Sequence, residues 1–197
     1  ARDGAGNVDA NTQVRQATTL DLTPPLFASV PSVSALTGTE SLEVTWSAAT
    51  DVVTPARDLR YRLYAARASG GQVFTAAGRA LETGPGAVRA VLTGAPDESG
   101  SVVPLVGGVR YHVVVRAVDS AGNESSNTQE GSAVVADVRP PVFGGAVNAV
   151  AQGRGAALVS WTAATDNVTP GSALRYRVFV AAPPAEVPEQ PAVEVVG

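Results

Sequence analysis

The sequence of 197 residues contains no cysteine, no lysine, no isoleucine and no methionine. The absence of cysteine excludes disulfides, thiolate metal sites and a cysteine nucleophile. All 14 basic residues are arginine, and Ala, Val, Gly and Pro dominate, which is typical of a GC-rich bacterial coding sequence. Because no initiator methionine is present, we expect the chain to be a piece of a longer protein.

Clustered positive charge and long apolar runs are also missing. The formal net charge of −4 argues against a nucleic-acid partner, which would require a basic surface. No apolar run approaches the roughly 18 residues of a membrane-spanning helix. Aromatic residues make up only 5% of the chain, so the sequence does not indicate a strip of exposed rings for carbohydrate binding.

The sequence contains an internal repeat. The segment 1–25 aligns without a gap on 117–141 at an offset of 116 residues, and 44–66 aligns on 159–181 at an offset of 115. A period of this length is too long for a solenoid unit and favours independently folding domains. We therefore expect residues 1–22 to be the last loop and strand of a preceding repeat, 23–138 a complete repeat, and 139–197 the N-terminal part of the following one.

The residue patterns within one repeat are those of β-strands. In "SLEVTWSA" the side chains of Leu42, Val44 and Trp46 alternate with polar ones, which places the apolar set on one face of a half-buried strand. "LRYRLYA" and "VRYHVVVRAVD" alternate in the same way. Turn signals separate the strands, and no run of ten or more residues has a helical period. Several short strands with frequent turns predict a β-sandwich.

Three residues make the repeat resemble a bacterial fibronectin type III domain. Trp46 matches the core tryptophan of that family, and Leu105 precedes Tyr111 by the family's spacing ahead of the sixth strand. The resemblance implies an all-β fold: an antiparallel immunoglobulin-like β-sandwich of fibronectin type III topology, in tandem repeats. It also implies a tyrosine corner at Tyr111, in which the hydroxyl bonds back to the backbone. The stretch 70–104 is longer than the family pattern, and we expect an extended hairpin or a wide loop there.

The strand patterns and the resemblance together predict the buried residues. The expected structural core consists of Leu42, Val44, Trp46, Tyr61, Leu63, Leu105, Tyr111, Val113, Val115, Val159, Trp161 and Tyr176.

Catalytic chemistry finds little support in the sequence. His112 is the only histidine and lies within a strand, with no nucleophile motif around any serine. The carboxylates of the predicted loops have the character of solvated loop charge rather than of a glycosidase pair. We expect no catalytic residues, no cofactor and no enzymatic activity in this chain.

A calcium site is the sharper alternative. Asp119 and Asn123 lie in the loop after the sixth strand, and Asp51 lies in the loop after the second. In the fibronectin type III topology these loops share the pole that meets the preceding domain, where oxygen ligands could hold a hard cation. The simpler interpretation is that these side chains cap turns through their own backbone, as Gly122 beside Asn123 indicates. The sequence leaves both interpretations open.

The junctions between repeats predict a rod. Pro24-Pro25 and Pro140-Pro141 mark short, semi-rigid linkers. The first hypothesis is a non-catalytic spacer, stalk, filament or adhesin segment of a long extracellular or cell-surface bacterial protein. The second is an accessory region of a secreted carbohydrate-active enzyme whose catalytic domain lies outside this chain.

Partners would then be the neighbouring repeats of the same chain, further copies of it, or another surface protein. Arginine and aromatic side chains are favoured in interfaces, although a solvated sheet face is an equally simple reading of this pattern. The candidates for lateral contact are Arg60, Arg62, Tyr64, Arg175, Arg177 and Phe179.

Overall fold

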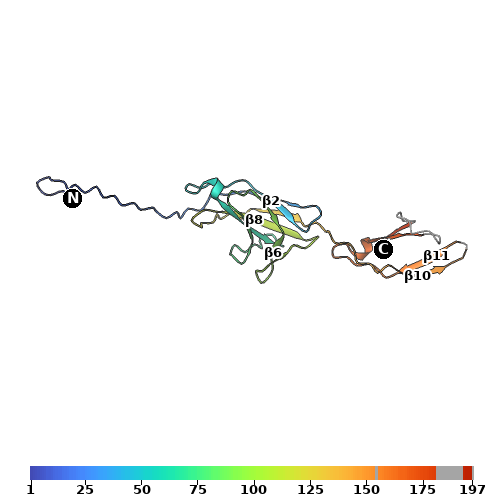
Figure 1. Cartoon of the computed structure of the whole chain (residues 1–197). Coiled ribbons are helices and arrows are strands. Elements are labelled where there is room, and N and C mark those ends of the chain that lie inside the picture. The colour runs from blue at the N-terminus through green and yellow to red at the C-terminus, as the bar shows by residue number, and fades with distance from the viewer. Residues whose placement is uncertain (154, 181–192, 197) are drawn as a thin grey trace.

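The computed structural model describes residues 1–153, 155–180 and 193–196. A β-sandwich occupies the middle of the chain, as Figure 1 shows. An extended N-terminal arm leaves it on one side, and a smaller β-region that contains β10 and β11 follows on the other. Among the described residues, no helix is long and apolar enough to cross a membrane.

The central sandwich is built from two antiparallel sheets. One sheet has three strands in the order β1-β2-β5, and the other has four in the order β4-β3-β8-β9. The strands are β1 (Ser32–Ala35), β2 (Leu42–Thr45), β3 (Arg60–Ala66), β4 (Arg79–Glu82), β5 (Arg89–Leu92), β8 (Arg110–Val118) and β9 (Glu130–Val134). This arrangement is the all-β, antiparallel, immunoglobulin-like sandwich that the sequence predicts.

Period-two alternation explains which side chains the sheets bury. In β2 the side chains of Leu42 and Val44 are fully buried, while those of Glu43 and Thr45 are only partly covered. The ten predicted core residues that lie in the central sandwich or at Tyr176 are buried, namely Leu42, Val44, Trp46, Tyr61, Leu63, Leu105, Tyr111, Val113, Val115 and Tyr176. The core therefore lies between the two sheets, where it packs side chains from both.

The stretch 70–104, for which the sequence predicts only a hairpin or wide loop, contains four short strands. β4 pairs with β3, and β5 pairs with β2, so this stretch contributes one strand to each sheet. β6 (Gly94–Pro96) and β7 (Val102–Pro104) then form a separate hairpin. The expected hairpin is thus present, but it accounts for only part of the stretch.

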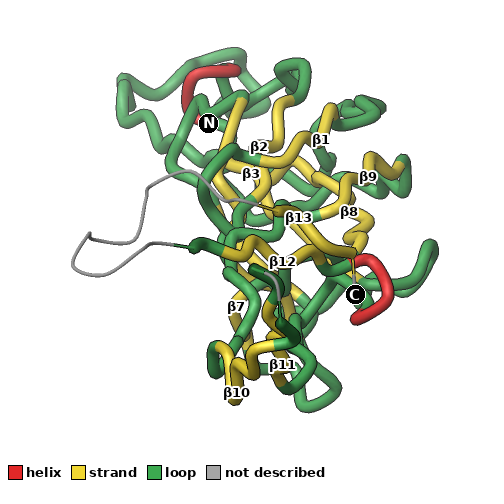
Figure 2. Tube along the Cα trace, turned by 90° about the vertical axis from the view of Figure 1, so that its right-hand side faces the viewer, coloured by secondary structure: helices red, strands yellow, loops and turns green. Residues whose placement is uncertain are grey.

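The contacts around Tyr61 recur around Tyr176 in the second β-region. Strand β10 (Ala146–Ala151) pairs with β11 (Ala157–Trp161), and β12 (Arg175–Val178) pairs with β13 (Val193–Val196). A single turn of 3-10 helix precedes β3 at Ala56–Asp58 (η1) and precedes β12 at Gly171–Ala173 (η2). Figure 2 shows β10, β11 and β12 close together in this second region.

Two predicted core residues of the second region are less buried than expected. Val159 and Trp161 are partly exposed, whereas Tyr176 beside them is buried. Trp161 packs against Tyr176 at 5.2 Å between ring centroids, but the buried cluster of this region has only three members among the described residues. A short strand pair without an opposing sheet cannot enclose a core, which explains the exposure.

The predicted last strand within residues 1–22 does not form. Across this segment the structure has one isolated bridge, between Arg2 and Val8, around a turn. A strand requires a partner for its backbone groups, and none of the described residues pairs with residues 14–18, the counterpart of β9. The turn itself matches its counterpart at Asp119, where Val118 and Glu124 form the corresponding bridge.

Candidate functional site

Three carboxylates meet at the pole of the sandwich where the N-terminal arm enters. Asp21 comes from the arm, Asp51 from the loop after β2, and Asp119 from the loop after β8. Each offers one carboxylate oxygen, and these oxygens lie within 4.8 Å of one another. Asp119 is buried, and Asp21 and Asp51 are half-buried. The structure therefore brings together two of the predicted calcium ligands and adds one from the arm.

The two loops that supply Asp51 and Asp119 are tied to each other. Oδ1 of Asp51 accepts hydrogen bonds from the backbone N–H groups of Val53 and Thr54, at 2.9 and 2.6 Å. The hydroxyl oxygens of Thr54 and Ser120 lie 2.9 Å apart, and the Ser120 N–H donates to the Thr54 hydroxyl. The expected capping of turns is thus present, and it fixes the positions of both carboxylates at once.

Asn123 acts as a donor at this pole, which differs from the ligand role considered for it. Its backbone N–H donates to Oδ1 of Asp119 at 2.8 Å, and its side-chain amide donates to Oδ2 of Asp119 at 2.7 Å. The same amide nitrogen donates to the backbone oxygen of Asp21 at 3.1 Å. Asn123 therefore positions Asp119 and holds the arm, with its NH2 group turned to these oxygens.

Asp21 is the member that the sequence patterns miss. Its Oδ1 accepts a hydrogen bond from the N–H of Thr23. Its Oδ2 has less than 1 Å² of accessible surface and no hydrogen-bond partner. Burying an unpaired charged oxygen is costly, because the oxygen loses its hydration and gains nothing in return. The only sequence signal was the match of Asp21 with Asp137 in the repeat alignment.

No positive side chain neutralises these three carboxylates within the described part of the chain. The ion pairs found there engage Asp9, Asp58, Glu40, Glu43, Glu82, Glu124 and Glu130. Asp21, Asp51 and Asp119 belong to none of them. Like charges at such a separation repel one another, so the pole is an electrostatic trap for a small cation.

The candidate lateral contacts on β3 divide into exposed and buried side chains. Arg60 is exposed, while Arg62 forms ion pairs with Glu82 at 3.0 Å and with Glu124 at 2.7 Å. Tyr64 is only 2% exposed, so the prediction that it lies outward for contact is wrong.

The reason for the burial of Tyr64 is the loop that follows β3. Phe74 of this loop packs edge-on against the Tyr64 ring at 5.2 Å, and Arg116 lies 3.5 Å from the centroid of the Phe74 ring. The Tyr64 hydroxyl donates to Glu124 at 2.8 Å. In the second β-region, Arg175 and Arg177 are exposed, and Phe179 is 39% exposed.

The same network shifts the pKa values of its members. Burial, followed by the hydrogen bond to Glu124, raises the pKa of Tyr64 to about 12. The hydrogen bond from Arg62 lowers the pKa of Glu82. Hydrogen bonding to Glu124 raises the pKa of Arg62. At neutral pH the network therefore holds a neutral tyrosine, charged arginines and charged glutamates.

His112 lies beside a carboxylate and a serine, but not in the order of a catalytic triad. Its Nδ1 is 3.4 Å from Oε2 of Glu130, and the Ser69 hydroxyl donates to that same oxygen at 2.7 Å. Glu130 thus lies between serine and histidine, whereas a triad requires histidine to contact the serine. Burial opposes ionisation of Glu130, but hydrogen bonds from Gly70 and Ser69 outweigh it and lower its pKa. This group anchors the loop after β3 to β9.

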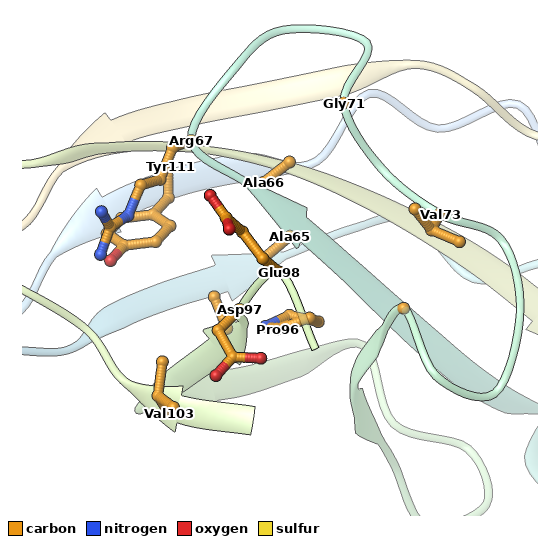
Figure 3. A pocket seen from close by; sticks show the side chains of 12 residues that line it. Ala65, Ala66, Arg67, Gly71, Val73, Pro96, Asp97, Glu98, Val103 and Tyr111 are labelled. Carbon is orange, nitrogen blue, oxygen red and sulfur yellow. The ribbon is translucent and has the colours of Figure 1, made fainter. Parts of the chain in front are cut away.

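The predicted tyrosine corner is formed by a different tyrosine. Within the described residues the Tyr111 hydroxyl makes no hydrogen bond, whereas the Tyr61 hydroxyl accepts one from the backbone N–H of Ala49 at 2.8 Å. Tyr111 instead lines an open pocket between β3, the loop after it and the β6–β7 hairpin, which Figure 3 shows.

Charged side chains at this pocket are Arg67, Asp97 and Glu98, and most of the remaining lining is small or aliphatic. Asp97 caps the hairpin turn, because its Oδ1 accepts hydrogen bonds from Ser99 and Ser101. Arg67 lies 5.9 Å from the Tyr111 ring centroid, a cation–π distance. Each charged group in the pocket except Glu98 therefore has an evident structural role.

Comparison with known proteins adds two distant structural likenesses. No family model and no curated protein matches the chain. The spore cortex lytic enzyme SleM of Clostridium perfringens has a TM-score of 0.33 and 17% identity, over 57% of this chain and 29% of that one. The chicken CNTN1 FN1–FN3 domains have a TM-score of 0.33 and 18% identity, over 88% of this chain and 54% of that one. The chain thus spans little more than half of the longer of these matches.

Proposed function

We propose that this chain is a non-catalytic structural segment of a long extracellular bacterial protein composed of tandem fibronectin type III repeats. In this role it is a spacer, stalk, filament or adhesin segment that works through its length and stiffness. Its partners are the neighbouring repeats and, at the exposed arginines of β3 and β12, further copies or another surface protein.

The recurrence of one core arrangement along the chain supports this function. Phe27 packs on Tyr61 at 5.6 Å, and Phe143 packs on Tyr176 at 5.2 Å, with the same interplanar angle of 62°. The hydroxyl of Tyr176 accepts from Ala164 at 2.7 Å, as that of Tyr61 does from its own loop. A chain that repeats the same core at a fixed interval is suited to spanning distance.

Contacts at the second junction favour a restrained connection between successive repeats. Arg139, directly before Pro140, forms an ion pair with Glu40 at 2.8 Å. Val168 of the second region lies so close to Gly108 of the sandwich that a Cβ at Gly108 would be 2.7 Å from it. Short proline linkers with contacts on both sides resist bending more than a Gly/Ser tether does.

Small-angle X-ray scattering on the 197-residue chain tests this function. A compact domain of this length has a radius of gyration of about 16 Å, and we expect a clearly larger value that does not change with concentration. A value near 16 Å would contradict the spacer role. The gene sequence on either side provides the second test, because further repeats and a surface anchor support a stalk, whereas a glycosidase domain supports the accessory role.

A further inference from the structure

We propose that Asp21, Asp51 and Asp119 bind one calcium-like divalent cation, which fastens the N-terminal arm to the pole of the central sandwich. The ligands come from the arm and from two loops, and they converge only in the folded chain. Binding rests on the geometry of the pole alone. Its consequence for stiffness rests on the proposed spacer function.

The separation of the carboxylates suits an ion of this size. Calcium binds oxygens at about 2.4 Å, so two oxygens around one ion can lie at most about 4.8 Å apart. The oxygens of Asp21, Asp51 and Asp119 meet this limit pair by pair, since all of them lie within 4.8 Å of one another. Three carboxylates also give the hard, anionic oxygen set that calcium prefers.

A buried atom without a partner marks the site independently of the cluster. Oδ2 of Asp21 has less than 1 Å² of accessible surface and accepts no hydrogen bond, while Oδ1 of the same side chain is used by Thr23. The free oxygen is therefore the one that Asp21 can offer to a ligand. A cation at the pole would satisfy it, and it would also supply the positive charge that no described arginine provides.

The surroundings hold the ligands in place and leave room for water. Asn123 donates to both Asp119 and the backbone oxygen of Asp21, so it positions two ligands without needing to be one. The bond between Thr54 and Ser120 fixes the two loops. Asp51 and Asp21 are only half-buried, so water can complete the six to eight oxygens of a calcium site.

The same ligand positions recur in the repeat. Asp3 and Asn7 align with Asp119 and Asn123, and the Asn7 amide likewise donates to Oδ2 of Asp3 at 2.7 Å. In the second region Asp166 aligns with Asp51 and accepts the same pair of N–H groups, from Val168 and Thr169. Each repeat therefore presents the elements of the site at the same place relative to its linker.

Isothermal titration of the chelator-treated chain with calcium chloride tests the proposal. We expect one site per chain with a Kd on the order of 10⁻⁴ to 10⁻³ M, the range of extracellular modules. Asp51→Asn and Asp21→Asn should each weaken binding at least tenfold. Asparagine keeps the Oδ1 acceptor that caps each turn, and Asp21 lies outside the sandwich core, so the folded state is preserved and circular dichroism checks this.

Asp166→Asn is the matched control, because it alters the same turn away from the cluster. Its affinity should equal that of the wild type. Absence of binding by the folded wild type at 10-fold the expected Kd would overturn the proposal, as would unchanged affinity in both Asp21→Asn and Asp51→Asn. Equal loss in Asp166→Asn would overturn it as well.

Hydrogen exchange of the backbone amides at 20–24, with and without calcium, tests the fastening of the arm. Slower exchange with calcium supports it, and unchanged exchange in a chain that binds calcium would refute the fastening while the site stands. A compact scattering radius together with intact calcium binding would instead refute the spacer function alone.

Discussion

The hydroxyl of Tyr61 accepts a hydrogen bond from the backbone N–H of Ala49 at 2.8 Å, across twelve residues of sequence. Both groups are buried, and the ring also packs against Trp46 at 5.3 Å. The bond therefore closes the loop between β2 and β3 over the core. Its counterpart between Tyr176 and Ala164 does the same in the second region.

Replacing Tyr61 by phenylalanine should lower the free energy of unfolding of the central sandwich by about 1–3 kcal/mol. The ring packing is retained, but the buried N–H of Ala49 loses its acceptor. Urea unfolding followed by tryptophan fluorescence measures the change. Tyr176→Phe serves as the comparison, and it should leave the unfolding midpoint of the sandwich where it was.

Tyr64 should titrate with a midpoint of about 12, above the usual value near 10. Because folding raises this pKa, the neutral hydroxyl contributes stability that is complete below pH 10 and disappears as the pH rises through 12. The ultraviolet absorbance of phenolate, taken as the difference between the wild type and Tyr64→Phe, gives the midpoint. A difference curve centred on pH 10 would show that Tyr64 lies outside the network with Glu124.

Gly131→Ala should destabilise the sandwich by about 1–3 kcal/mol, as overpacking does. A Cβ at this position would lie 2.1 Å from the backbone oxygen of Pro31 and 2.8 Å from the Val33 side chain. Because one of these atoms is backbone, the strand itself must move. Gly84→Ala is the control, since no atom lies within 4 Å of the Cβ it would add. Thermal unfolding of the two variants should differ clearly.

Gly108→Ala should disturb the second junction beyond the local strain it causes. Gly108 has φ +76°, and its new Cβ would lie 2.7 Å from Val168. Gly38 has φ +77° with nothing within 4 Å, so Gly38→Ala imposes a similar backbone strain of roughly 1–2 kcal/mol without the contact. Methyl NMR signals of Val168 should shift in the first variant alone. Equal spectra at Val168 would contradict the contact.

The sequence predicts the sandwich well because its core depends on local alternation. Trp46, Tyr61 and Leu105 are all buried, as their strand positions require. Tyr64 occupies an outward position on β3 yet is buried, because a loop with no periodic pattern places Phe74 on it. Strand alternation predicts which face a side chain takes, but not what later covers that face.

The candidate cation site shows the same limit. The loop positions of Asp51 and Asp119 follow from the order of the strands, so their proximity could be expected. Asp21 precedes the first strand, and its place depends on the path of the arm and on a hydrogen bond from Asn123, 102 residues later. No local pattern encodes a contact of that kind, and only the repeat alignment gives a hint of it.

The close packing of Gly131 on Pro31 has a mechanical consequence. Tension along the chain would enter the sandwich near β1 and leave it near β9, the strand that contains Gly131. These strands belong to different sheets, yet their backbones approach so closely that a methyl group cannot fit between them. A pull on the two ends must therefore separate this seam before it can peel either sheet away from the other.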